Sequence, residues 1–358
     1  MASTFFSEII PGNVADSGKD SQIGSIDLQK NNSKVLIISD LHMGCGKRDD
    51  LAGNGNFLTY MLEHYYYPNG WILVLNGDVE ELYRYSLAKI QQQWQNLYRV
   101  FSLFAAENRL YKTLGNHDEA LIFEKNYPYH LYQALRIETS RGPIFVYHGH
   151  QSSNVYTKYG TVPRYMVRYI LKPFGIKNVS SDRNPHRRFS LEKNAYAFSV
   201  ENACVSVIGH THRVLFESLC RFDFIRYEIE QLCRDYPVSE DQEKERIVAE
   251  VSALRAELSS IKRSERKDVL RKSLYGDELP VPCLFNSGSV ISRSGINALE
   301  LDNENIALVY WFIEGKQRKF VKQGNYKIEE MPGTIYCRTV LNHEKLDYIN
   351  ARIELLGN

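Results

Sequence analysis

The feature that most constrains the fold is an alternation of short apolar runs with helix-like segments in the first third of the chain. The runs at 34–39, 71–76 and 110–114 have the length and continuous apolar character of strands buried on both faces. Between them, 57–67 and 91–107 carry apolar residues at helical spacing. This order implies right-handed crossovers, so the sequence predicts parallel strands with helices packed against them.

Later strands and two insertions complete the predicted organisation. The further strands are expected at 144–147, 204–208, 283–286, 298–301 and 306–312. The insertions are a helical cap at 151–203 and a helical hairpin at 220–278. We therefore expect one domain over 34–335, preceded by an irregular segment at 1–33 and followed by a tail at 336–358.

The second insertion differs from the rest of the chain in the spacing of its apolar residues. Its apolar residues form two stripes with alternating spacings of four and three, which are Ile225, Ile229 and Leu232, then Ile247, Val251, Leu254, Leu258 and Ile261. That spacing predicts a two-helix antiparallel hairpin with a coiled-coil-like seam. Because its remaining faces carry mixed charge, we expect it to serve in structure, self-association or binding of a protein partner rather than in chemistry.

Charge and cysteine usage exclude several classes of protein. With 44 basic and 43 acidic residues the net charge is +1, so no nucleic-acid partner is expected. The six cysteines are scattered without a Cys-x-x-Cys pair, which is typical of reduced thiols in a cytoplasmic protein. The chain shows neither a leader-like segment nor about twenty consecutive apolar residues, so we expect no membrane span and leave peripheral membrane contact open.

Polar residues follow the predicted strands in five short blocks, which hold six of the ten histidines. In chain order the blocks are Asp40-Leu41-His42, Gly77-Asp78, Gly115-Asn116-His117-Asp118, His148-Gly149-His150 and Gly209-His210-Thr211-His212. Because each block follows a buried strand, we expect all five to converge on one edge of the sheet, where open α/β sheets bind ligands. Imidazole, carboxylate and amide donors together favour Mn, Fe or Zn over Ca or Mg.

This ordered set of blocks resembles the calcineurin-like metallophosphoesterase superfamily, from residue 34 to about 312 apart from the two insertions. The resemblance implies an α/β fold, a four-layer α/β/β/α sandwich of two mixed sheets flanked by helices, and two divalent metal ions. It assigns one metal to Asp40, His42, Asp78 and His212, and the other to Asp78, Asn116, His148 and His210. Asp78 then bridges the metals, while His117 faces the substrate and Asp118 orients it.

The expected chemistry follows from such a metal pair. Two cations about 3.5–4 Å apart acidify a shared water and bind phosphoryl oxygens. We expect the bridging hydroxide to attack a phosphate ester or pyrophosphate while His117 protonates the leaving oxygen. Manganese is the predicted metal, with iron, zinc or a mixed pair as alternatives. The substrate is expected to be a small phosphorylated compound, with nucleotide-linked and lipid-linked compounds among the candidates.

Three further features have two interpretations each. Arg183, Arg187 and Arg188 in the first insertion either bind a second phosphate or form a solvated surface run. His150 is either a group that supports a ligand or an alternative ligand. The turn Asn286-Ser287-Gly288-Ser289 resembles the superfamily's strand-end turn near the site, and a plain tight turn fits it as well.

Within the superfamily, the segment 77–81 lacks the Asp-Arg-Gly continuation of protein serine/threonine phosphatases. The acidic Glu80, the first insertion and the Asn-x-Gly-Ser turn are loosely similar to the UDP-2,3-diacylglucosamine pyrophosphatase branch. His150 stands where that branch usually has an acidic residue, so the same substrate does not follow. The alternative functions are a non-catalytic binding scaffold that uses the hairpin, and a nuclease or phosphodiesterase.

Overall fold

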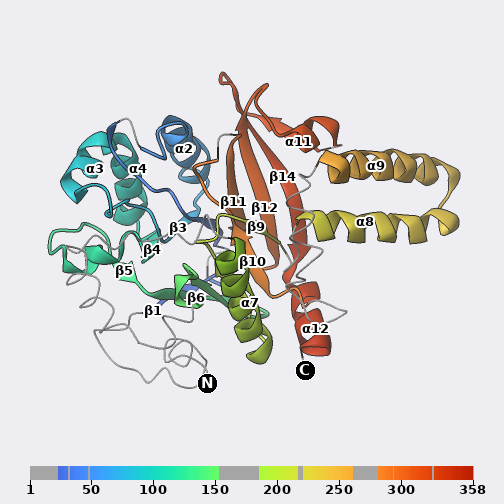
Figure 1. Ribbon diagram of the computed structural model, residues 1–358, viewed down its shortest axis with the longest axis horizontal. Coiled ribbons are helices and arrows are strands. Elements are labelled where there is room, and N and C mark those ends of the chain that lie inside the picture. Colours follow the sequence, from blue (N-terminus) through green and yellow to red (C-terminus); the bar gives the residue numbers. More distant parts are fainter. Residues whose placement is uncertain are drawn as a thin grey trace.

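The computed structural model describes residues 23–30, 33–46, 49–152, 185–216, 221–260, 281–292, 294–324 and 326–357. Two β-sheets form its centre, and a pair of long helices projects from one side (Figure 1). No helix in these ranges combines the length and the apolar character needed to cross a membrane.

The larger sheet has eight strands in the order β13-β14-β12-β11-β2-β3-β4-β5. Strands β2 to β5 pair in parallel, as the strand–helix alternation predicts, whereas β11 pairs antiparallel with β2. The bounds are β2 Val35–Ile38, β3 Ile72–Asn76, β4 Leu110–Thr113, β5 Leu131–Tyr132, β11 Ile296–Leu301, β12 Asn305–Ile313, β13 Ile328–Glu330 and β14 Tyr336–Lys345. The sheet is therefore mixed, with its parallel half built from the first third of the chain.

The smaller sheet has six strands in the order β1-β6-β7-β8-β10-β9. It is also mixed, because β7, β8 and β10 run parallel while β6 and β9 pair antiparallel with β7 and β10. The bounds are β1 Ile23–Asp27, β6 Ala134–Thr139, β7 Gly142–Tyr147, β8 Val205–Ile208, β9 Val214–Leu215 and β10 Leu284–Ser287.

Alternate residues of β2 face two different cores, which places this strand between two layers. Val35 and Ile37 pack in the core shared with the smaller sheet, while Leu36 and Ile38 pack in the core shared with α2 and α4. The helices are α2 Gly55–Met61, continued by the π-helical turn η2 Leu62–Tyr66, α3 Leu87–Gln93, α4 Gln95–Ala106, α7 Pro185–Glu201 and α12 Leu346–Leu356. Helix α7 packs on β8 and β10, so the predicted α/β/β/α sandwich is confirmed.

The five polar blocks come from both sheets rather than from a single sheet edge. The first three follow β2, β3 and β4 of the larger sheet, and the last two follow β7 and β8 of the smaller one. Asn76 joins the two groups, because its side chain donates to the carbonyl of Tyr147 (3.1 Å) and accepts from the hydroxyl of Thr113 (2.8 Å). The expectation of one edge is corrected: two facing sheets bring their strand ends together.

The second insertion contains the two helices that the apolar stripes predict, α8 Arg221–Asp235 and α9 Asp241–Ser260, joined by the turn η7 Tyr236–Val238. They run side by side and project away from the sheets (Figure 1). Ile225 and Ile247 of the predicted stripes are buried, whereas Ile261 lies outside the described residues. Near the sheets, α9 contacts the short helix α11 Lys319–Gln323.

The segment 1–33, predicted to be irregular, and the predicted tail at 336–358 both contain regular structure. Within 1–33, β1 forms an edge strand parallel to β6. Within 336–358, β14 pairs with β12 along its length and α12 follows it. Both strands are partly exposed and carry several polar residues, which weakens the apolar signal that identifies a buried strand.

The cap predicted at 151–203 is described only at its two ends. Helix α7 occupies the end next to β8. The amphipathic stretch at 165–176 lies outside the described residues.

Candidate metal centre

Left-handed backbone is concentrated at the predicted metal ligands. In the described part of the chain, seven residues other than glycine have a positive φ, and five of these are predicted ligands. They are Asp40 (57°), His42 (46°), Asp78 (52°), His210 (63°) and His212 (56°). This conformation is unfavourable for residues with a Cβ, and it persists only where the surrounding structure imposes it. The strand-end turns are therefore shaped to direct these side chains inward.

Close approach of the turns requires glycine at two of the blocks. A Cβ on Gly115 would lie 2.2 Å from both the backbone nitrogen and Oδ1 of Asp78. A Cβ on Gly77, whose φ is +75°, would lie 2.5 Å from the His148 ring. Glycine at these positions lets two strand ends contact each other without an intervening side chain.

The first cluster of donors consists of Asp40, His42 and His212, whose ligand atoms lie within 4.8 Å of one another. The Nε2 atoms of His42 and His212 are 3.2 Å apart, and His212 Nε2 is 3.2 Å from Asp40 Oδ1. Ser39 donates to Asp40 Oδ2 (2.6 Å), and the backbone nitrogen of His210 lies 3.1 Å from both oxygens. The carboxylate is thereby fixed in orientation beside the two imidazoles.

The second cluster consists of Asp78, His148 and His210, all of them buried. His148 Nδ1 lies 2.8 Å from the carbonyl oxygen of Asn76, which can only accept, so Nδ1 carries the proton. The other ring nitrogen, Nε2, is 3.1 Å from Asp78 Oδ2 and is left to act as a ligand. Nearby in sequence and on the same turn as His117, Asn116 buries an Oδ1 that has no hydrogen-bond partner within the described structure.

Asp78 lies between the two clusters. Its Oδ2 is 3.1 Å from His148 Nε2 in the second cluster and 3.9 Å from His42 Nε2 in the first. Its Oδ1 accepts from the backbone nitrogen of His117 (2.7 Å). This placement is the one expected for a carboxylate that bridges two metals.

Buried carboxylates of the centre remain ionised because imidazoles surround them. Burial raises the pKa of Asp40, but His212 and His148 outweigh it and bring the pKa to about 2. The same opposition holds the pKa of Asp78 well below its usual value, with His148 as the main counter-charge. Burial lowers the pKa of His148, but the charge and hydrogen bond of Asp78 raise it to about 10. These mutual shifts show how strongly the groups interact.

The donor set fits a pair of divalent cations. Two carboxylates and four imidazoles form two adjacent buried or half-buried groups, and Asp78 of the second group lies 3.9 Å from His42 of the first. Asn116, next to His117 in sequence, adds an amide oxygen that is buried without a partner among the described residues. Mixed nitrogen and oxygen donors of this kind suit transition-metal ions and zinc. The site is a dinuclear divalent metal site, and the identity of the metal does not follow from the donors.

His117 lies beside this centre and is held by a carboxylate that the sequence analysis did not assign. Its Nδ1 is 2.8 Å from Glu81 Oε2, and the same oxygen is 3.2 Å from Nδ1 of His42. The rings of His117 and His42 meet edge to face with centroids 4.7 Å apart. Glu81 thus orients one predicted ligand and the predicted acid together.

Asp118 does not orient His117 as expected from the resemblance. Its two oxygens accept from the backbone nitrogens of Val79 (2.8 Å) and Gly115 (2.7 Å), and Lys112 Nζ lies 3.2 Å away. These contacts leave its carboxylate facing the backbone of two turns rather than the imidazole of the neighbouring residue. Asp118 therefore ties the turn after β3 to the turn after β4.

A family comparison identifies this arrangement. Residues 33–238, more than half of the chain, match the calcineurin-like phosphoesterase family model. The chain belongs to the calcineurin-like phosphoesterase family. It is accordingly a metal-dependent phosphoesterase, in agreement with the resemblance of its five blocks.

Other comparisons add little to this assignment. A search of curated proteins found no match. Among solved structures, the phosphoesterase Yfce from E. coli is 13% identical, with 76% of this chain and 91% of that chain covered and a TM-score of 0.31. Vacuolar Protein Sorting 29 from Cryptosporidium parvum (11% identity, 80% and 93%, 0.33) and a dimetal phosphatase from Danio rerio (10%, 77% and 95%, 0.33) are similarly distant. Likeness this weak carries no argument, so the assignment rests on the family match.

In this phosphoesterase, His150 stands outside the two donor clusters. Its Nε2 is 2.9 Å from Glu119 Oε1, and both side chains are buried. Its ring centroid is 5.5 Å from that of His148 and 6.2 Å from that of His210. Of the two interpretations left open by the sequence, the geometry favours a group that supports the ligands.

The turn 286–289 lies against the first donor cluster. Ser289 donates to the backbone carbonyl of Asp40 (3.2 Å), and the Ser39 hydroxyl that donates to Asp40 lies 3.0 Å from the carbonyl oxygen of Gly288. Asn286 donates to the carbonyl of Gly209 (3.0 Å) and contacts the hydroxyl of Thr211 (3.0 Å). The turn therefore braces two of the ligand-bearing loops, which the Asn-x-Gly-Ser pattern alone did not distinguish from a tight turn.

The three arginines expected to bind substrate are not placed against the centre by the structure. Arg183 lies outside the described residues, and Arg187 and Arg188 lie on α7 where side chains are not described. A different cation reaches the edge of the centre: Arg84 Nη2 is 3.4 Å from Glu81 Oε2 and also pairs with Asp50. Its side chain is 38% exposed.

Proposed function

We propose that this phosphoesterase hydrolyses a phosphate ester or pyrophosphate of a small compound, with His117 protonating the leaving oxygen. The observation that carries the proposal is the meeting of six donors in two adjacent groups, with Asp78 in reach of both and His117 fixed at their side. When bound, two divalent cations supply an acidified water and neutralise the negative charge that accumulates on the phosphoryl group. Manganese is the metal we propose.

Within the proposal, the chain supplies a fixed set of ligands. Asp40, His42 and His212 would hold one cation, and Asn116, His148 and His210 would hold the other. Asp78, which is in reach of both groups, would contribute its charge to both cations and reduce the repulsion between them. The hydrogen bonds that Ser39 and Asn76 make to these ligands set their orientation before any substrate binds.

The proposed proton donor is positioned by two contacts on opposite sides. The backbone nitrogen of His117 donates to Asp78, and its Nδ1 engages Glu81, so Nε2 is the ring nitrogen that would meet a leaving oxygen. Glu81 fixes the tautomer and the ring plane, a role supported by its second contact to His42. With only 16% of its side chain exposed, His117 acts in a site that admits little bulk water.

The decisive experiment is hydrolysis by the purified, manganese-loaded enzyme of a panel of phosphomonoesters, phosphodiesters and nucleotide-linked pyrophosphates, with the Asp78→Asn variant as the inactive reference. Turnover of at least one class, abolished in the variant, supports the proposal and assigns the bond that is cleaved. A loaded, folded enzyme that hydrolyses none of the three classes overturns it.

A further inference from the structure

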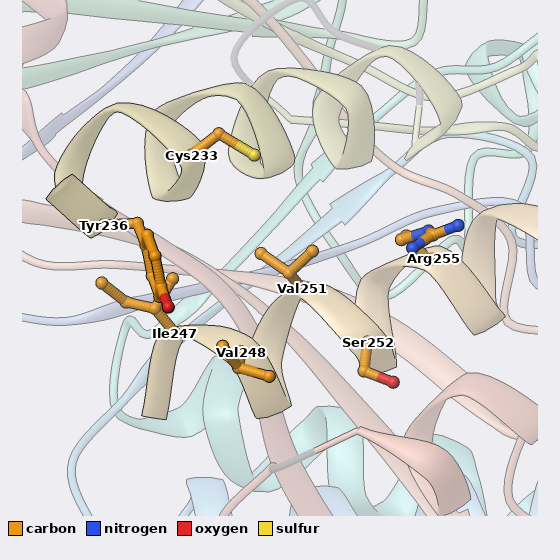
Figure 2. Close-up of a pocket in the computed structure, with 7 residues that line it drawn as sticks. All are labelled: Cys233, Tyr236, Ile247, Val248, Val251, Ser252 and Arg255. Atoms are coloured by element: carbon orange, nitrogen blue, oxygen red, sulfur yellow. The ribbon is translucent and has the colours of Figure 1, made fainter. Parts of the chain in front are cut away.

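The hairpin of α8 and α9 carries an open groove on one face. The groove has a volume of about 670 Å³ and is lined by Cys233, Tyr236, Ile247, Val248, Val251, Ser252 and Arg255 (Figure 2). Its walls are mainly apolar, and several side chains around it are exposed, including Val248 (55%), Tyr236 (42%) and Val238 (84%). None of the residues in the metal centre lines it. A groove between two helices is the shape into which a third helix packs.

One stripe of α9 borders this groove at the spacing of a helix–helix seam. It consists of Glu245, Val248, Ser252 and Arg255, separated by three, four and three residues. The last three line the groove, and Glu245 precedes them on the same face of the helix. The stripe has an acid at one end and a base at the other. Within the described structure neither Glu245 nor Arg255 makes an ion pair, although other charged residues of α9, such as Arg246 and Glu243, pair with each other.

This arrangement of charge is self-complementary. An antiparallel copy of α9, related by a two-fold axis at the level of Glu250, would place Arg255 opposite Glu245 of the other copy, and the reverse, because 245 and 255 are equidistant from 250. Val248 would then face Ser252 of the other copy. An acidic or a basic partner would satisfy only one end of the stripe, whereas a second copy satisfies both.

We propose that the hairpin is a dimerisation element, in which α9 of one chain lies in the groove of a second copy and the two hairpins form an antiparallel four-helix bundle. The face is about 30 Å long for 20 residues of α9 and about 20 Å wide for two helices, which is of the order needed for the ~800 Å² per partner of a specific interface. The net charge of +1 opposes association only weakly. This assembly is independent of the proposed reaction.

Charge reversal tests the register as well as the association. Sedimentation velocity of the full chain from about 1 to 100 µM should show a dimer. Glu245→Arg and Arg255→Glu should each weaken dimerisation about tenfold or more. In a dimer of either variant, positions 245 and 255 carry the same charge, and the two-fold axis brings them together at two places. An equimolar mixture of the two variants should recover association, because each then meets a complementary charge. Both should hydrolyse substrate and unfold as the wild type does.

Glu250→Arg is the matched control, because it makes the same charge change on the opposite side of α9, and it should leave the dimer intact. Val248→Glu, which puts a charge into the apolar groove, should dissociate it. A wild-type chain that stays monomeric throughout this concentration range overturns the proposal. So does a dimer that survives both reversals, or a variant mixture that associates no better than either variant alone.

Discussion

The metal centre and the hairpin differ in how the chain builds them. The centre assembles side chains from five turns of two sheets and holds five of its ligands in left-handed backbone with buried charges. The hairpin is a contiguous pair of regular helices whose charged residues form exposed pairs three or four residues apart, such as Arg234 with Glu230. Such surface pairs contribute at most about 1 kcal/mol each.

This contrast indicates that the surrounding fold must stabilise the metal centre, whereas the hairpin does not need such stabilisation. Strained backbone and buried charge are unfavourable unless many surrounding contacts impose them, so their concentration at one place marks a site kept for chemistry. Within the described residues 221–260, the hairpin has no left-handed backbone and Glu257 as its one buried charged residue, and it is suited to recognition. Changes at the centre should therefore alter catalysis in a folded protein, and changes at the hairpin should leave catalysis alone.

The strongest test of this contrast is Asp78→Asn. The substitution removes the charge that lies within reach of both clusters while keeping the size of the side chain, so we expect loss of both metals and a fall in turnover of about a thousandfold or more. Elemental analysis and turnover of the same preparation measure the two effects. Asp347→Asn on α12 makes the same chemical change at the surface and should change neither. Retention of two metals by Asp78→Asn would contradict the bridging position.

A smaller effect is expected for His117→Ala, which removes the proposed proton donor and no ligand. Turnover should fall about 100-fold or more, the usual scale for loss of a general acid, while the metal content stays at the wild-type value. The comparison is made with His343→Ala, an exposed histidine on β14. If His117→Ala loses as much metal as Asp78→Asn, the separation between ligand and acid fails.

Glu81→Gln sharpens the comparison within the centre itself. The amide keeps the size of the side chain but loses the charge that His117 and His42 share, so we expect about a tenfold fall in kcat with both metals retained. The same substitution at the neighbouring Glu80 should instead lower stability, because Glu80 is fully buried against Lys112 and the hydroxyls of Tyr98 and Tyr127. Thermal unfolding and kcat of the two variants distinguish these outcomes. Equal behaviour of the pair would refute the assignment of Glu81.

Glu80 and Glu81 also show what sequence reasoning reaches at this site. The five blocks could be identified from sequence because an apolar strand followed directly by polar residues is a local signal. The structure brings those blocks together. The two adjacent glutamates are chemically alike, yet one turns into the core and the other into the centre. Which way each turns depends on the conformation of the loop after Asp78, and sequence pattern does not encode it.

Elements that the sequence did not predict, such as β14, also depend on contacts with distant parts of the chain. The strand β14 buries only Cys337 and Thr339, and its identity as a strand depends on β12 lying beside it. The role given to Asp118 was wrong because a carboxylate next to a histidine in sequence need not face it in space. The apolar stripes of the hairpin, by contrast, carry their periodicity within a single helix each, and both helices were predicted.

The smallest expected effect comes from removing the hairpin. Leu215 of β9 pairs with Asn286 of β10, so the chain segments on either side of the insertion already lie in adjacent strands about 5 Å apart. A short Gly-Ser linker in place of residues 220–278 should therefore join them without disturbing either sheet.

None of the described donors lies on α8 or α9, so the shortened chain should hydrolyse a generic aryl phosphate within about twofold of the full chain, with both metals bound. It should lose some stability where α9 covers α11, and thermal unfolding measures that separately from kcat. A shortened protein that folds and binds metal yet is inactive would contradict the division between the two regions. In that case α8 or α9 must contribute to substrate binding, and the contrast between a chemical centre and a recognition element would have to be abandoned.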